Sequence, residues 1–129
     1  MIAVTPAKNQ DQIKEVFNEL GQTLSEKSMA VTAVENNKQI GCAAFNFDGE
    51  ELTLLSVKYP KNDIFVCDLI SRGVMNFGVN RNILYCELGP DAPIDEFVKL
   101  GFIKSKAEAS VNIIKAFMEC KSCKSKQQN

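Results

Sequence analysis

The chain has 129 residues, the size of one globular domain, with 45% apolar and 24% charged residues. Its net charge of −1 makes a basic nucleic-acid surface unexpected. No apolar run approaches the roughly 20 residues needed to span a bilayer, so no membrane association is expected.

The sequence contains no histidine. This removes the commonest general base and metal ligand, together with every histidine-dependent triad or zinc motif. Any catalysis must therefore use carboxylates, tyrosine, lysine, cysteine or backbone amides. Most of the five cysteines sit in apolar runs, as reduced, buried thiols do, and the N-terminus does not look like a signal peptide. A cytoplasmic location is expected.

The first predicted elements are a strand and a helix. The strand covers Ile2 to Thr5 and is stopped by Pro6. Asn9 is the expected N-cap of the helix, and Gly21 is the expected C-terminal glycine. The helix has one apolar stripe for a core, made of Ile13, Val16, Phe17 and Leu20.

A three-stranded antiparallel meander should follow. Its strands are predicted over residues 29–35, 39–47 and 52–57, with turns at Asn36-Asn37 and Asp48-Gly49. The strands contain long apolar segments, which indicates that both faces of the sheet are covered.

The second half should alternate helices and strands. The helix after Pro60 has an apolar stripe that includes Gly73, so it is expected to lie close to the sheet. The strand over 83–88 should be parallel to the last meander strand, through a right-handed crossover. A second helix runs from 89–93 to Leu100-Gly101, and 102–118 is predicted as one or two returning strands.

These elements predict an α/β (α+β) fold, a mixed sheet of about six strands flanked by three helices. Residues 1–120 form the single predicted domain, and 121–129 a basic, polar, disordered tail. A ligand crevice in such a sheet lies beyond the carboxyl ends of parallel strands. This places a site near 56–66 and 86–90.

Two segments carry a family resemblance. Glu96-Phe-Val-Lys-Leu-Gly-Phe102 resembles the last-helix ending of the GNAT (N-acetyltransferase) superfamily, and Leu55-Ser-Val57 resembles its central strand. The element order is similar over nearly the whole chain. The resemblance implies a GNAT acyl-CoA N-acyltransferase-like fold and, for an active member, transfer of an acetyl or acyl group from acyl-CoA to an amine.

The resemblance also implies where a cofactor would lie. The backbone of Leu55, Ser56 and Val57 would align the pantetheine of acetyl-CoA. The phosphates would meet the loop of Lys61, Asn62, Asp63, Ile64, Phe65 and Val66. Ile64 and Val66 replace the two family glycines, so apolar side chains fill the space that the pyrophosphate needs. Asp63 caps a helix well but repels a phosphate.

The catalytic positions depart from the family as well. Phe97 replaces the tyrosine that often protonates the leaving thiolate. Glu87 is the only plausible base, although an outward-facing strand residue is the simpler interpretation. Tyr59 is the remaining candidate acid, and Tyr85 faces away from Cys86.

The thiols allow a separate interpretation. Cys86 is predicted to be a core residue, and Cys67 to be partly exposed. Cys120-Lys-Ser-Cys123 has the spacing of a redox pair or half a zinc site, although chance placement in a reduced tail is the simpler interpretation. A complete zinc site would need two further ligands from other cysteines or carboxylates, and no metal site is expected.

Three hypotheses follow. The chain is an acyl-CoA-dependent N-acyltransferase, whose amine acceptor is an unknown small molecule or protein. Alternatively, it is a catalytically degenerate GNAT-fold binding or dimerisation module, for which a homodimer is an expected partner. The third hypothesis is a redox or metal role for Cys120 and Cys123. The substitutions at Ile64, Val66 and Phe97 favour the second.

Overall fold

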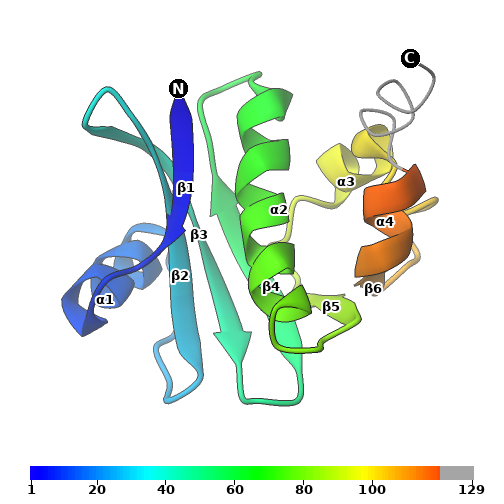
Figure 1. The fold of residues 1–129 in the computed structure, drawn as a ribbon, viewed down its shortest axis with the longest axis horizontal. Helices are drawn as coiled ribbons and strands as arrows, with labels where there is room; N and C mark the ends of the chain where they lie inside the picture. The colour runs from blue at the N-terminus through cyan, green and yellow to red at the C-terminus, as the bar shows by residue number, and fades with distance from the viewer. Residues whose placement is uncertain (120–129) are drawn as a thin grey trace.

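The fold was examined in a computed structural model that describes residues 1–119. Its elements follow in chain order (Figure 1): β1 (Ile2–Pro6), α1 (Gln10–Glu19), β2 (Ser28–Glu35), β3 (Lys38–Phe47), β4 (Leu52–Lys58), α2 (Ile64–Val79), β5 (Tyr85–Leu88), α3 (Ile94–Leu100), β6 (Ser110–Asn112) and α4 (Ile113–Glu119). The six strands form one sheet in sequence order, β1 to β6. Among the strands of residues 1–119, only β4 and β5 pair in parallel, as the α2 crossover predicts.

The predicted cap and turns of the first half are confirmed. The Asn9 side chain accepts a hydrogen bond from the Gln12 backbone at 2.9 Å, which starts α1. Asn36 and Asn37 make the β2–β3 turn with positive φ angles of 54° and 64°. Asp48 caps the β3–β4 turn through the backbone N–H groups of Glu50 and Glu51. These local signals set the register of the meander.

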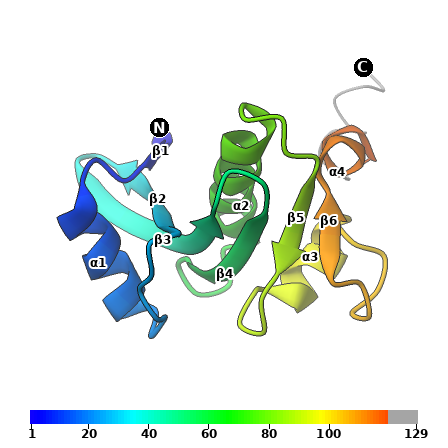
Figure 2. The same cartoon turned by 90° about the horizontal axis from the view of Figure 1, so that it is seen from below.

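Two apolar cores lie on the two faces of the sheet, as predicted for the meander. The smaller core is buried under α1 and contains Ile13, Val16, Phe17, Ala30, Cys42 and Ala44. The larger core lies under α2 on the other face, where the rings of Phe45 and Phe47 both contact Phe77 edge to face. Figure 2 shows α1 and α2 packed beside different parts of the twisted sheet.

Gly73 lets α2 approach the sheet closely, as expected. A Cβ atom there would lie 2.6 Å from Val4 Cγ1, so a larger residue would force β1 and α2 apart. The same helix brings Val66, Ile70 and Val74 into the core. The predicted apolar stripe of this helix is therefore confirmed.

The C-terminal prediction was wrong in one element. Within residues 1–119, only Ser110–Asn112 return as a strand and Ile113–Glu119 form α4, so the described part of the chain has four flanking helices instead of three. The Asn112 side chain accepts from the Lys115 backbone at 3.1 Å and starts this helix. Ile113, Ala116 and Phe117 then repeat at i, i+3 and i+4 towards the core, a helical period that could have been recognised.

No helix within residues 1–119 is long and apolar enough to cross a membrane. The predicted tail over 121–129, as well as Cys120 and Cys123, lies outside the described residues.

Candidate functional site

The expected site begins where β4 runs past the end of β5. β4 pairs with β5 only over Leu52–Leu54, whereas it pairs with β3 as far as Lys58. Gly89 donates its backbone N–H to the Leu54 carbonyl at 2.9 Å, and Pro90 cannot extend the ladder. Within residues 1–119, the β5-facing edge of Ser56 and Val57 therefore has no partner strand. This notch lies where the resemblance places a pantetheine.

A bulge gives the notch its shape. Ala44 pairs with Ser56 and Phe45 pairs with Leu54, so Leu55 is the extra residue on β4. A Cβ at Gly89 would lie 3.2 Å from the Leu54 carbonyl oxygen, so a glycine allows the two strands to meet there. The bulge and the glycine together end the parallel pairing at Leu54.

The turn after β4 leads directly into α2. Asn62 has a positive φ of 65°, and the Asp63 backbone N–H donates to the Pro60 carbonyl at 3.0 Å. The Asp63 carboxylate then accepts a hydrogen bond from the Val66 backbone at 3.2 Å, and its carbonyl accepts from Cys67 at 3.3 Å. The first turn of the helix is therefore capped by its own acidic side chain.

The other loop residues are arranged around this cap. Lys61 and Asn62 are exposed, Ile64 is half-buried, Phe65 is 60% exposed and Val66 is buried in the α2 core. Lys58 is ion-paired with Glu19 of α1, whereas no ion pair within residues 1–119 holds Lys61. Lys61 is thus the cation that the loop offers.

Acyl-CoA does not fit this loop in the family's manner. A pyrophosphate at the start of α2 would lie next to the Asp63 carboxylate. The two negative charges would repel each other at the helix end that would otherwise stabilise the phosphates. The sequence resemblance aligns the β-branched Ile64 and Val66 with the family's two glycines, and the Val66 side chain is buried in the core. The residues of this loop therefore disfavour the binding of acyl-CoA, the cofactor that the fold implies.

Side chains also bridge the notch. The Tyr59 hydroxyl donates to the Glu96 carboxylate at 2.5 Å and joins the end of β4 to α3. Burial, followed by this hydrogen bond, raises the pKa of Tyr59, so the phenol holds its proton and is a poor general acid. The Gln22 amide donates to Asp91 at 2.9 Å and joins the loop after α1 to the loop after β5.

The two expected catalytic positions do not meet. Phe97 is fully buried and packs edge to face on Phe102, with ring centroids 5.1 Å apart. Glu87 is exposed on β5 and lines a cavity of about 250 Å³ together with Glu50 and Glu51, beside the start of β4. No lining residue of that cavity belongs to 55–66. Glu87 and the candidate cofactor loop therefore do not line this cavity together.

The three described thiols are core residues. Burial raises the pKa of Cys42 to about 11 and of both Cys67 and Cys86 to about 12. This agrees with the expectation for Cys86, whereas the prediction of a partly exposed Cys67 was wrong. α2 is covered by the sheet on one side and contacted by α3 on another, so its buried face is wider than one stripe. Residues 1–119 hold no group of three potential metal-ligating side chains.

Sequence reasoning missed both of these side-chain hydrogen bonds. The partners in Tyr59–Glu96 are 37 positions apart and those in Gln22–Asp91 are 69 apart, so no local pattern links them. The identity of Asp63 as a cap was visible in the sequence.

Comparisons with known proteins support the fold. No protein-family model and no curated protein sequence matches the chain. Solved structures do match. The putative N-acetyl transferase YhhK from E. coli, bound to coenzyme A, is 9% identical at a TM-score of 0.55, over 85% of this chain and 95% of that one. A probable acetyltransferase from meticillin-resistant Staphylococcus aureus is 20% identical at 0.54, over 80% and 90%.

A third similar structure is described as a predicted acetyltransferase with acetyl-CoA from Clostridium acetobutylicum. It is 15% identical at a TM-score of 0.51, over 89% of this chain and 98% of that one. With this architecture, the molecule has the GNAT N-acetyltransferase fold: a mixed six-stranded sheet with helices on both faces. Identities at this level establish the fold alone.

Proposed function

We propose that this chain is a catalytically degenerate GNAT-fold protein that acts as a binding or dimerisation module. The observation that carries the proposal is the Asp63 carboxylate at the start of α2, bonded to the Val66 backbone at 3.2 Å. This carboxylate puts a negatively charged helix cap where an anion-binding loop would be open to a phosphate. This chain has the core of the fold but lacks the surface that would bind a phosphate.

The remaining positions support the same proposal. Phe97 has no proton to donate, and the Tyr59 hydroxyl is directed at Glu96. Each feature serves packing or the connection between β4 and α3. The side chains at the notch between β4 and β5 thus connect parts of the protein to each other.

Calorimetric and thermal-shift titrations with acetyl-CoA test the proposal. A ligand at about 100 times its dissociation constant stabilises a protein by about 2.7 kcal/mol, which at this size shifts Tm by several degrees. We expect no saturable heat and no shift at about 1 mM acetyl-CoA. Saturable binding that Lys61→Ala weakens would contradict the proposal.

The matched variant is Asp63→Ser. Serine keeps a capping oxygen, so the helix and the fold should be preserved, but the negative charge is gone. If the carboxylate repels phosphates, this variant should bind acetyl-CoA more tightly than the wild type does. Equal affinities would show that Asp63 does not control the loop.

Acyl-CoA-dependent N-acyl transfer to an amine is the second candidate function. It is favoured by the unpaired edge of Ser56 and Val57 and by the coenzyme A and acetyl-CoA in two of the similar structures. In this case Leu55 to Val57 and the loop 61–66 would meet the cofactor, and Glu87 would be the base. Turnover on a panel of small amines, lost in Glu87→Gln, would support it. A cytoplasmic location and the thiol role of Cys120 and Cys123 remain predictions.

A further inference from the structure

Four large apolar side chains are exposed together at the C-terminal corner of the molecule. Leu84 and Tyr85, at the start of β5, are 56% and 52% exposed, and Ile114 and Met118 of α4 are 43% and 60% exposed. With Asn112 and Lys115 they line one shallow cavity of about 480 Å³. We call Leu84, Tyr85, Ile114 and Met118 the Tyr85 patch.

The sheet topology explains why this patch is uncovered. Cys86 and Val111 point into the α2 core, so their neighbours Tyr85 and Asn112, which pair across β5 and β6, face the other way. α1, the helix on that face, packs on β2 and β3 and does not cover these last two strands.

The α4 residues of the patch follow from its helical period. Ile114 and Met118 are four positions apart and share the outer face of α4, while Ile113 and Ala116 are buried on the inner face. The helix therefore has apolar side chains on two sides. Only the inner side has a partner within residues 1–119.

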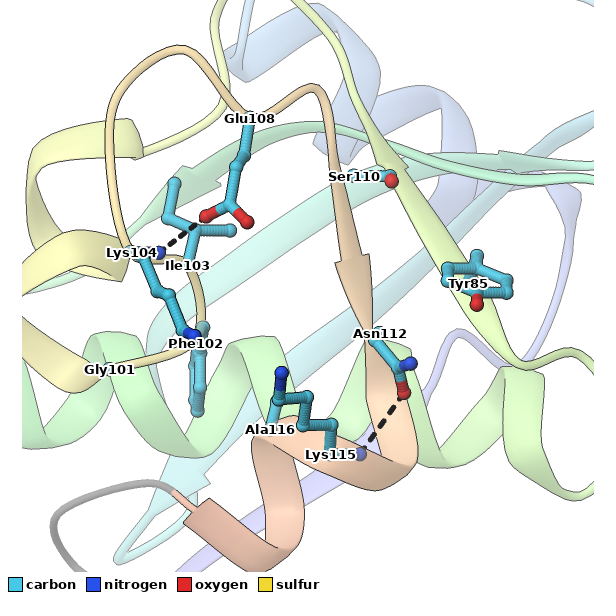
Figure 3. A pocket seen from close by; sticks show the side chains of 10 residues that line it. All are labelled: Tyr85, Gly101, Phe102, Ile103, Lys104, Glu108, Ser110, Asn112, Lys115 and Ala116. Atoms are coloured by element: carbon cyan, nitrogen blue, oxygen red, sulfur yellow. Dashed lines mark hydrogen bonds between the residues drawn. The ribbon is translucent and has the colours of Figure 1, made fainter.

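Basic side chains lie on one side of Tyr85 and acidic side chains on the other. This residue lines three cavities, and the one in Figure 3, of about 220 Å³, is also lined by Lys104 and Lys115. Glu108 borders the same opening, but its carboxylate accepts hydrogen bonds from the backbone N–H groups of Lys104 and Ser105.

The opposite flank is acidic. Glu50, Glu51 and Glu87 line the third cavity with Leu84 and Tyr85. None of these carboxylates has an ion pair within residues 1–119. The patch thus lies between a basic flank and an acidic flank.

We propose that the Tyr85 patch is the contact surface between two copies of this chain, related by a two-fold axis near Tyr85. A two-fold contact is self-complementary, so each surface meets the same surface turned by half a rotation. Rotation about Tyr85 brings the basic flank of one copy onto the acidic flank of the other. A surface that is apolar in the centre and oppositely charged on its two sides fits this arrangement.

The size of the patch fits a dimer. Four large side chains, each about half exposed, offer on the order of 400 Å² of apolar surface. Two facing copies would supply roughly half of the about 1,600 Å² in a standard interface, with the polar flanks supplying the rest. Tyrosine is a common anchor at the centre of such contacts. The sequence over 120–129 has no large apolar residue to match the patch.

This inference deepens the proposed function by naming the partner and the surface. Its experiment has a separate readout, because the oligomeric state does not depend on acetyl-CoA. Binding of acetyl-CoA would overturn the proposed function without changing the sedimentation result. A monomeric protein would overturn the dimer and leave the titration unaffected.

Sedimentation velocity of the full chain, from about 1 to 200 µM, is the test. We expect a reversible dimer in this range. Leu84→Ser and Ile114→Ser remove apolar contacts from exposed positions, so each variant should fold and should raise the dissociation constant at least about tenfold. Leu24→Ser, which changes another exposed leucine that lines none of the three cavities at Tyr85, is the matched control and should be within about twofold of wild type. Circular dichroism verifies folding.

Charge reversal tests the two-fold geometry directly. Lys115→Glu and Glu87→Lys should each weaken self-association. In a dimer of either variant, residues of like charge at positions 115 and 87 face each other across the contact. A mixture of the two variants should restore self-association, since every flank then meets an opposite charge. A monomer throughout the concentration range, a dimer that ignores the patch variants, or a mixture no tighter than its components would overturn the proposal.

Discussion

The first four strands and the last two are built differently. β1 to β4 have 5, 8, 10 and 7 residues, and the sheet that they form packs against α1 on one face and α2 on the other. β5 and β6 have 4 and 3 residues, and within residues 1–119 they are covered only on the α2 face. The first region has enclosed nearly all its apolar side chains, whereas the second leaves several in solvent. Stability is therefore expected to reside in the first region, and interactions with other molecules in the second.

The strongest test of this difference in stability is to replace one aromatic residue of each region with alanine. Phe45→Ala removes a buried ring that packs on Phe77 at 5.0 Å, and we expect a loss of about 3–5 kcal/mol. Tyr85→Ala removes a half-exposed ring and should cost less than about 1 kcal/mol. Urea unfolding at low protein concentration measures both. Similar losses would mean that the two regions do not differ as described.

The Tyr59–Glu96 hydrogen bond is a side-chain link between the two regions, in addition to the backbone pairing of β4 with β5. Tyr59→Phe removes the donor and leaves a half-buried carboxylate without it, so we expect a loss of about 1–2 kcal/mol. Glu96→Gln keeps an acceptor oxygen and should cost less. The measurement is urea unfolding of both variants at pH 7. A neutral Tyr59→Phe would show that the contact contributes nothing to the link between the regions.

The same tyrosine gives a pH test. Its pKa is raised in the folded protein by burial and by Glu96, whereas the unfolded tyrosine titrates near about 10. The stabilisation is therefore fully present below that pH and is lost as the pH rises, because the unfolded chain releases the proton first. Wild type should lose stability more steeply than Tyr59→Phe above about pH 10. Parallel curves would rule out this coupling.

The smallest effect is expected at an exposed ion pair of the second region. Lys106 lies 3.0 Å from Asp95, with both side chains mostly in solvent. Lys106→Ala should change stability by less than about 0.5 kcal/mol, and about 1 M salt should remove even this difference. Thermal unfolding at low and high salt measures it. A larger effect would indicate that the loop before β6 stabilises the β5–β6 pair.

The sequence signals that succeeded were local. Asn9, the Asn36-Asn37 turn and the Gly73 stripe each act over a few residues, and each predicted its element correctly. α4 was not predicted, because the whole stretch over residues 102–118 was interpreted as one or two returning strands. The substitutions at the candidate site were also visible, since Asp63 and Phe97 lie within matched motifs.

Long-range contacts were beyond prediction. Neither Tyr59 nor Glu96 carries a pattern that points to the other, and only the fold brings them together. The same holds for the Tyr85 patch, which depends on where α1 ends and where α4 begins. Local propensity sets the elements, whereas tertiary packing decides which of their faces remain uncovered.

The parallel pairing of β4 with β5 also has a consequence for how the chain folds. β1 to β4 join neighbours through turns, apart from the α1 connection, but Leu52 meets Cys86 only after α2 has crossed the sheet. Closing that longer loop costs more entropy than closing a hairpin, which delays β5 and β6 relative to the meander. On a ribosome, this order leaves the growing chain with an assembled meander while the corner that carries Tyr85 is still forming. The surface proposed for self-association is therefore completed only after the meander has formed.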